Sequence, residues 1–126
     1  MPGFIEQGQW KSFLDDFTRR NQFRTTRLET VGQAGAQEEA KYLPLVGVSY
    51  EPKGSDAGDV VIILGTETGQ DTRHFEHVIP EVERVAPLLG DTGEDGLGFE
   101  DREGGKTLLV FEKLPEIPEE TATHQR

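Results

Sequence analysis

The chain has 126 residues and no cysteine, and its 24 acidic and 13 basic side chains give a formal net charge of -11. This length fits one domain, and the lack of cysteine excludes disulfide scaffolds, thiolate zinc sites, iron–sulfur clusters and cysteine nucleophiles. The negative charge argues against a protein that binds nucleic-acid phosphate, while the lack of a signal peptide pattern or of a run of roughly 20 apolar residues predicts a soluble cytoplasmic protein with no membrane contact.

The first predicted element is an amphipathic helix over residues 7–20. Its apolar residues recur at i, i+3, i+4 and i+7, which forms one stripe along a helix. The residues of this stripe are Trp10, Phe13, Leu14 and Phe17. Ile5 and Trp10 have the spacing of a hydrophobic staple if Glu6 is the N-cap. We expect Asn21 to take the left-handed conformation that ends the helix.

Short strands follow the helix. They are predicted at residues 24–31, 40–50, 59–64, 72–79, 97–101 and 106–112, and the segment 82–86 either resumes the fourth strand or begins a new one. Pro44 cannot donate to a sheet ladder, so the second strand is expected to bend, to bulge or to lie at an edge. The unbroken apolar run Val60–Leu64 predicts a strand that is buried on both faces, or covered by the helix on one. Residues 88–96 are expected to form a loop.

These elements predict an α+β fold. Short connections require antiparallel pairing, so the helix is expected to pack on a strongly twisted antiparallel sheet of six or seven strands. The same pattern also fits a sheet curled into a small barrel of the SH3 or Sm-like kind. The expected core residues are Trp10, Phe13, Leu14, Phe17, Leu28, Leu43, Leu45, Val48, Val61, Ile63, Val78, Leu108 and Val110.

The domain is expected to span residues 1–112. Residues 113–126 hold two prolines, several glutamates and no apolar period, which is typical of a disordered acidic tail.

Taken as a set, the apolar motifs resemble those of a family of short bacterial proteins catalogued as a domain of unknown function. The motifs that carry the resemblance are Trp10-x-x-Phe13-Leu14-x-x-Phe17-x-Arg19, Leu28-Glu29, Glu39-Ala40-x-x-Leu43-Pro44-Leu45-x-Gly47-Val48, Val61-x-Ile63-Leu64-Gly65, His77-x-Ile79-Pro80, Leu97-x-Phe99 and Thr107-Leu108-Leu109-Val110-Phe111. The resemblance covers about residues 5–112. It implies a small stand-alone bacterial domain and no particular activity. Family members often have Trp or Gly just past the helix, where this chain has Asn21-Gln22-Phe23.

One cluster of chemically capable side chains lies on the fourth predicted strand. His74 and Glu76 should share one face and His77 the other, because side chains alternate along a strand. A histidine beside a carboxylate is half of a metal site or a general base pair. The sequence shows no third ligand, so a solvated strand face is the simpler interpretation.

A second candidate is the acidic stretch from Asp91 to Gly96, followed by Glu100 and Asp101. Carboxylates around a glycine can wrap a calcium ion with oxygen ligands. Against the EF-hand pattern, however, Gly93 replaces a ligand and Arg102 stands where the bidentate glutamate belongs. An acidic hairpin loop is therefore the favoured interpretation.

The net charge admits three interpretations. It can reflect adaptation to a salty cytoplasm, simple solubility, or an acidic face for a basic partner. Solvation by carboxylates accounts for the first two without any specific contact.

The favoured functional hypothesis is a non-enzymatic protein-interaction or accessory module. Its partner is an unknown protein or a second copy of the chain, bound at an exposed strand edge. One alternative is a small-molecule or metal-dependent enzyme that uses His74 and Glu76, and another is an acidic mimic of nucleic acid. The sequence assigns no catalytic residue, no cofactor site and no metal site, and it predicts no nucleic-acid partner.

Overall fold

The computed structural model describes residues 3–32, 35–53, 56–65, 74–90 and 93–112. The predicted tail over residues 113–126 lies outside these ranges. The described elements are the 3₁₀ turn η1 (Gln7–Gln9), helix α1 (Trp10–Asn21) and strands β1 (Thr25–Gly32), β2 (Gly35–Lys53), β3 (Asp56–Gly65), β4 (His74–Ile79), β5 (Val82–Gly90), β6 (Gly93–Asp101) and β7 (Lys106–Phe111).

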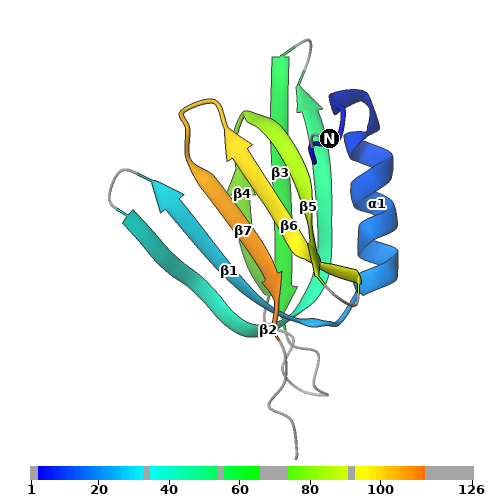
Figure 1. Cartoon of the computed structure of the whole chain (residues 1–126), viewed down its shortest axis with the longest axis vertical. Coiled ribbons are helices and arrows are strands. Elements are labelled where there is room, and N and C mark those ends of the chain that lie inside the picture. The colour runs from blue at the N-terminus through cyan, green and yellow to red at the C-terminus, as the bar shows by residue number, and fades with distance from the viewer. Residues whose placement is uncertain (1–2, 33–34, 54–55, 66–73, 91–92, 113–126) are drawn as a thin grey trace, which may run out of the picture.

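The strands form one antiparallel sheet in the order β4-β3-β2-β1-β7-β6-β5. The long strand β2 belongs to both halves of this sheet, because residues 35–44 pair with β1 while its part from Leu45 onward pairs with β3. The sheet turns at Pro44, as the sequence predicts for a strand that contains a proline. The two halves therefore lie face to face around a shared core, and the sheet stays open, so the barrel alternative is wrong (Figure 1).

Helix α1 packs against β2 and closes one side of this core (Figure 1). Its predicted stripe is confirmed, with Trp10, Leu14 and Phe17 buried and Phe13 packed at the margin. The indole Nε1 of Trp10 donates to the carbonyl of Ile5 at 2.9 Å, which fixes the chain that enters the helix. The Phe17 ring stacks on Phe111 with the two centroids 5.7 Å apart.

The helix ends differ from the prediction. The first predicted turn is the 3₁₀ turn η1, and the side chain of Glu6 makes no capping hydrogen bond. At the other end Asn21 is the last helical residue, and the left-handed conformation falls two residues later on Phe23, with φ of 73°. A bulky residue rarely adopts this conformation.

The core confirms the predicted elements but corrects the face that several strands bury. Its strand residues are Leu28, Leu45, Val48, Val60, Ile62, Leu64, Ile79, Val82, Val85, Leu97, Phe99, Leu109 and Phe111. The predicted core residues Ile63, Leu108 and Val110 are only partly buried, and Val78 is 46% exposed. Val61 is buried but stands outside the central cluster. These strands are apolar on both faces, so their alternation cannot show which face turns inward.

A candidate binding groove beside strand β4

A groove of about 380 Å³ opens on the inner side of the sheet, where β4 faces the hairpin of β1 and β2. One wall is His77–Pro80 at the end of β4. The opposite wall comes from residues 30–32 of β1 and from Gly35 and Gln37 of β2. The β6–β7 turn closes the groove with Asp101 and residues 105–107. Three segments that lie far apart in the sequence therefore meet at this opening: the β1–β2 hairpin, the end of β4 and the β6–β7 turn.

Strand alternation decides which β4 side chains reach the groove. The pairing places Phe75, His77 and Ile79 opposite Leu64, Ile62 and Val60 of β3, which point into the core. Ile79 is buried as a result, while the other two are half-buried. The wall of the groove along β4 is therefore apolar, with one imidazole set into it.

Burial lowers the pKa of His77 from its ordinary value of 6.5, because the charged imidazolium loses water there. The carboxylate of Glu39 acts in the opposite direction by favouring the charged form. Glu39 itself accepts a hydrogen bond of 2.9 Å from the hydroxyl of Thr30. At neutral pH the imidazole is neutral, so one ring nitrogen donates and the other accepts. This arrangement offers a ligand one polar contact on an apolar wall.

The acidic residue at the end of the groove already accepts hydrogen bonds from within the protein. Asp101 Oδ1 accepts hydrogen bonds from the backbone N–H groups of Glu103 and Gly105, both at 2.9 Å. These bonds hold the β6–β7 turn, which places Thr107 in the groove. We therefore interpret Asp101 as a structural residue of the turn.

The structure places the candidate catalytic residues on the faces that the sequence predicts. His74 and Glu76 are exposed on the outer face of β4, while His77 points inward, as the sequence predicts. Among the described residues, no three His, Cys, Asp or Glu side chains converge in a way that could hold a metal ion. Glu39 and Thr30, which do approach His77, lie far from it in sequence, so no spacing pattern could indicate them.

The acidic residues of β6 contribute to the fold. Glu94 forms a two-pronged contact with the guanidinium of Arg20 at 2.7 and 3.2 Å and accepts a third hydrogen bond from Asn21 at 3.0 Å. These contacts lower the pKa of Glu94, first through the hydrogen bond from Arg20. Glu100 pairs with Arg84 on β5. The predicted position Asp91 lies outside the described residues, and the described part of the stretch is an anchor between α1 and β6.

The two edges of the sheet differ in how open they are. The edge strand β5 contains Pro87, has register shifts near both of its ends, and accepts a backbone hydrogen bond at Val85 from the N–H of Ile5 at 2.7 Å. Strand β4 has an unbroken register with β3 and, within the described part of the chain, no pairing on its other side. Folded proteins usually protect such edges with proline, lysine or bulges. The residues of β4 include none of these devices.

The comparisons with known proteins place the chain in a family. The model of the family of unknown function DUF5335 matches residues 3–120. This chain belongs to that family. The resemblance stated from the motifs is thereby confirmed. An uncharacterized protein from Aquifex aeolicus (strain VF5) is 28% identical over 116 residues, which are 91% of this chain and 96% of that protein. No solved structure matches. No helix of the described residues has the length and apolar character needed to cross a membrane.

Proposed function

We propose that this member of DUF5335 is a non-enzymatic interaction module that adds an extended segment of a partner protein to strand β4. The observation that carries this proposal is the contrast between the two sheet edges: β5 is protected, whereas β4 is regular and, among the described residues, unpaired. In an antiparallel strand every second residue directs its backbone N–H and C=O away from its neighbour. An added strand would satisfy those groups.

The side chains around β4 define the chemistry of the partner. An added strand would turn alternate side chains into the groove, toward Ile79 and Thr107, where apolar or small polar residues fit. Its other side chains would lie beside Glu76 on the outer face, and opposite charges on neighbouring strands attract each other. The net charge of -11 favours a basic segment as well. We therefore infer a partner segment that alternates apolar residues with Lys or Arg.

A random peptide display library, screened on the immobilised full chain, tests this proposal. We expect enriched peptides with that alternation, and their dissociation constants can be compared between two matched variants. Val78→Lys changes an exposed apolar residue of β4, and Leu89→Lys changes an exposed apolar residue of β5. A lysine on an edge strand disfavours strand addition, and the lost contact of about 1 kcal/mol predicts roughly fivefold weaker binding for Val78→Lys.

The Leu89→Lys variant is expected to bind the same peptides with unchanged affinity, because it adds the same charge at the other edge. Equal losses of peptide affinity in the two variants would mean that charge alone governs binding. A screen that enriches no peptide, or peptides unaffected by Val78→Lys, would contradict a binding site at β4.

A further inference from the structure

Two exposed aromatic residues hold a backbone conformation that ordinarily belongs to glycine. Phe23 has φ of 73° and is 61% exposed, and Tyr42 has φ of 61° and is 57% exposed. Side chains with a Cβ atom are strained in this left-handed region, most of all bulky ones. Backbone strain of this kind is concentrated at functional sites of proteins. In both residues the strain accompanies an aromatic ring that is turned toward solvent.

Local structure explains how each ring is presented. Phe23 follows the C-terminus of α1, and its N–H donates to the carbonyl of Leu45 on β2 at 2.7 Å. Tyr42 has no partner in the β1–β2 register, where Thr26 pairs with Leu43 and Arg27 with Lys41, so it is the extra residue of a β-bulge. Bulges redirect side chains in this way. With a rise of about 3.3 Å per residue, Tyr42 lies roughly 10 Å along β2 from the residue that bonds Phe23.

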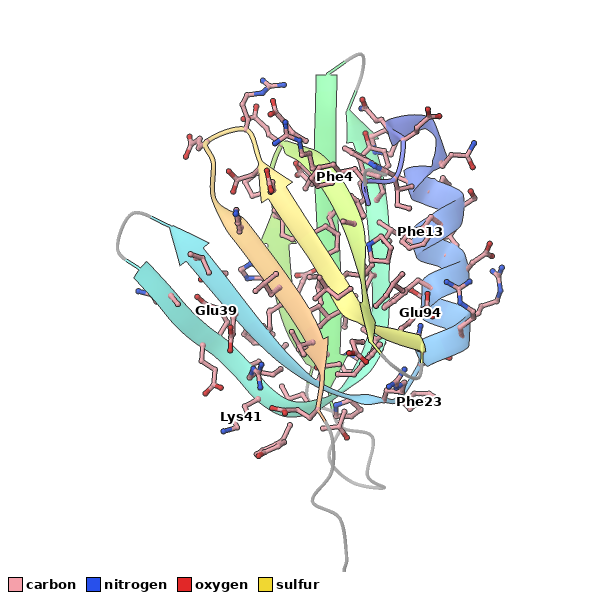
Figure 2. The ribbon with its side chains drawn as sticks, in the orientation of Figure 1. Phe4, Phe13, Phe23, Glu39, Lys41 and Glu94 are labelled. Atoms are coloured by element: carbon pink, nitrogen blue, oxygen red, sulfur yellow. The ribbon has the colours of Figure 1, made fainter. Side chains whose placement is uncertain are left out.

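Each of these aromatic residues has a basic neighbour in the sequence, and each of these cations lies over an aromatic ring, although Arg24 lies over Phe111 and not over Phe23. The guanidinium carbon of Arg24 lies 3.9 Å from the Phe111 ring centroid, and Lys41 Nζ lies 5.0 Å from that of Tyr42. Neither cation forms an ion pair with a carboxylate within the described ranges. Figure 2 shows Phe23 and Lys41 at the same end of the molecule. We call Phe23, Arg24, Lys41 and Tyr42 the aromatic end.

Strand β7 leads the chain toward the aromatic end. The N–H of Glu112 donates to the carbonyl of Thr25 at 2.9 Å, so the last described residue lies beside Thr25, two positions along the chain from Phe23. The sequence from there reads Lys113-Leu114-Pro115-Glu116-Ile117-Pro118-Glu119-Glu120. The family match extends through residue 120, so this segment belongs to the part of the chain that the family shares.

The segment has the composition that an aromatic, basic surface would bind. Two prolines three residues apart share one face of a polyproline II helix, which has three residues per turn, and Glu116 and Glu119 share another face. Proline faces of this kind pack on aromatic rings. The acidic face would meet Lys41, which has no carboxylate partner in the described part of the chain, and Arg24, which already interacts with Glu94. A polyproline II segment has no internal hydrogen bonds, so it requires no helical or alternating apolar pattern in the sequence.

We propose that the aromatic end is a docking surface for residues 113–120 of the same chain, held as a polyproline II segment with its prolines on Phe23 and Tyr42. Six residues in this conformation span about 19 Å. This site is separate from the groove at β4, and either proposal can fail without the other.

Paramagnetic broadening in the full chain tests the proposal. Because the chain has no cysteine, Thr121→Cys provides one position for a nitroxide label. We expect the amide signals of residues 23 and 42 to be lost when the label is active and to return when it is reduced. The signal of Gly104, at the far end of β7, should keep its intensity.

Replacing both strained aromatics with glycine supplies the decisive variant, since glycine accepts the same backbone conformation. The double variant Phe23→Gly and Tyr42→Gly should recover the signals at positions 23 and 42, while Phe4→Gly, which removes an exposed ring elsewhere, should not. Uniform intensities in the unaltered labelled chain, or broadening that survives the double variant, would overturn the proposal. Broadening between separately labelled chains in a mixed sample would assign the surface to a second copy and would overturn it as well.

Discussion

At the scale of single residues, three non-glycine residues of the described chain have a positive φ, and their structural roles differ. Phe23 and Tyr42 present exposed rings, whereas Glu81, with φ of 51°, joins β4 to β5. The N–H of Glu81 donates to Asp59 and its carbonyl accepts from the N–H of Arg102, while its carboxylate lies 3.5 Å from Arg102 Nη1. A left-handed residue with a side chain costs about 1–2 kcal/mol.

Glu81→Gly therefore tests how much strain the fold tolerates. We expect the free energy of unfolding in urea to rise by about 0.5–1 kcal/mol, because glycine relieves the strain but adds freedom to the unfolded chain. The matched variant is Glu83→Gly, which removes the same charge from a residue of β5 that lies at a register shift, is not among the positive-φ residues, and also faces Arg102 at 3.5 Å. That variant should lose about 0.5–1 kcal/mol. Changes of the same sign in both variants would contradict the strain that also underlies the aromatic end.

At the scale of elements, the C-terminus of α1 is joined to β6 through one carboxylate. Glu94 meets the guanidinium of Arg20 and the buried amide of Asn21, while Arg24 Nη1 donates to Asn21 Oδ1 at 2.9 Å and to the carbonyl of Glu94 at 3.2 Å. Figure 2 places Glu94 beside the helix end. Hydrogen bonds between charged groups are stronger than neutral ones. This network therefore fixes where the helix ends and where β6 begins.

Glu94→Gln is expected to lower the free energy of unfolding by about 1–2 kcal/mol at neutral pH. The pKa of Glu94 is lowered in the folded protein from its ordinary value of 4.5, so its carboxylate stabilises the fold above pH 4.5. That contribution is lost as the pH falls through the folded-state pKa. Urea unfolding of both proteins at neutral pH and in acid should show the difference shrink. A difference that is the same at both pH values would contradict the role given to the charge.

Glu103→Gln is the control for that experiment, because it removes one carboxylate that is exposed at the β6–β7 turn. Its free energy of unfolding should stay near that of the unaltered chain at both pH values.

The elements themselves could be predicted because each has a local cause. The helix stripe at Trp10, Leu14 and Phe17 has one period, and Pro44 marks the bend of β2. Which face of β3 and β7 turns inward could not be predicted, because Ile62 and Ile63 are equally apolar and only the surrounding strands decide between them. The predicted loop over residues 88–96 is wrong where it is described, because β5 extends to Gly90, β6 begins at Gly93, and these two glycines pair.

The candidate site was less predictable than the elements. The alternation of His77 against His74 and Glu76 is local and is confirmed. The electrostatic effect of Glu39 on His77 joins strands β2 and β4, which lie far apart in the sequence, so no local pattern contains it. The protection of β5 by Ile5 is likewise a contact between distant segments, so the difference between the two edges becomes visible only in the folded chain.

At the scale of the whole molecule, the sheet brings its two edges to different surroundings. One edge is covered by the N-terminal segment, and the other borders a groove with an apolar wall and a single histidine. An acidic protein with one open edge is suited to bind a basic extended segment and is poorly suited to pair with a second acidic copy. The interaction proposal therefore rests on the asymmetry of the sheet as a whole.

Amide hydrogen exchange across β4 tests this central claim most directly. In the free full chain we predict that amides of residues 74–79 alternate, with those bonded to β3 exchanging slowly and the outward ones exchanging fast. Adding a peptide enriched in the display screen should slow the outward amides of β4 and leave those of β5 unchanged. Outward β4 amides that are already slow in the free protein, or a peptide that protects β5 instead, would contradict strand addition at β4.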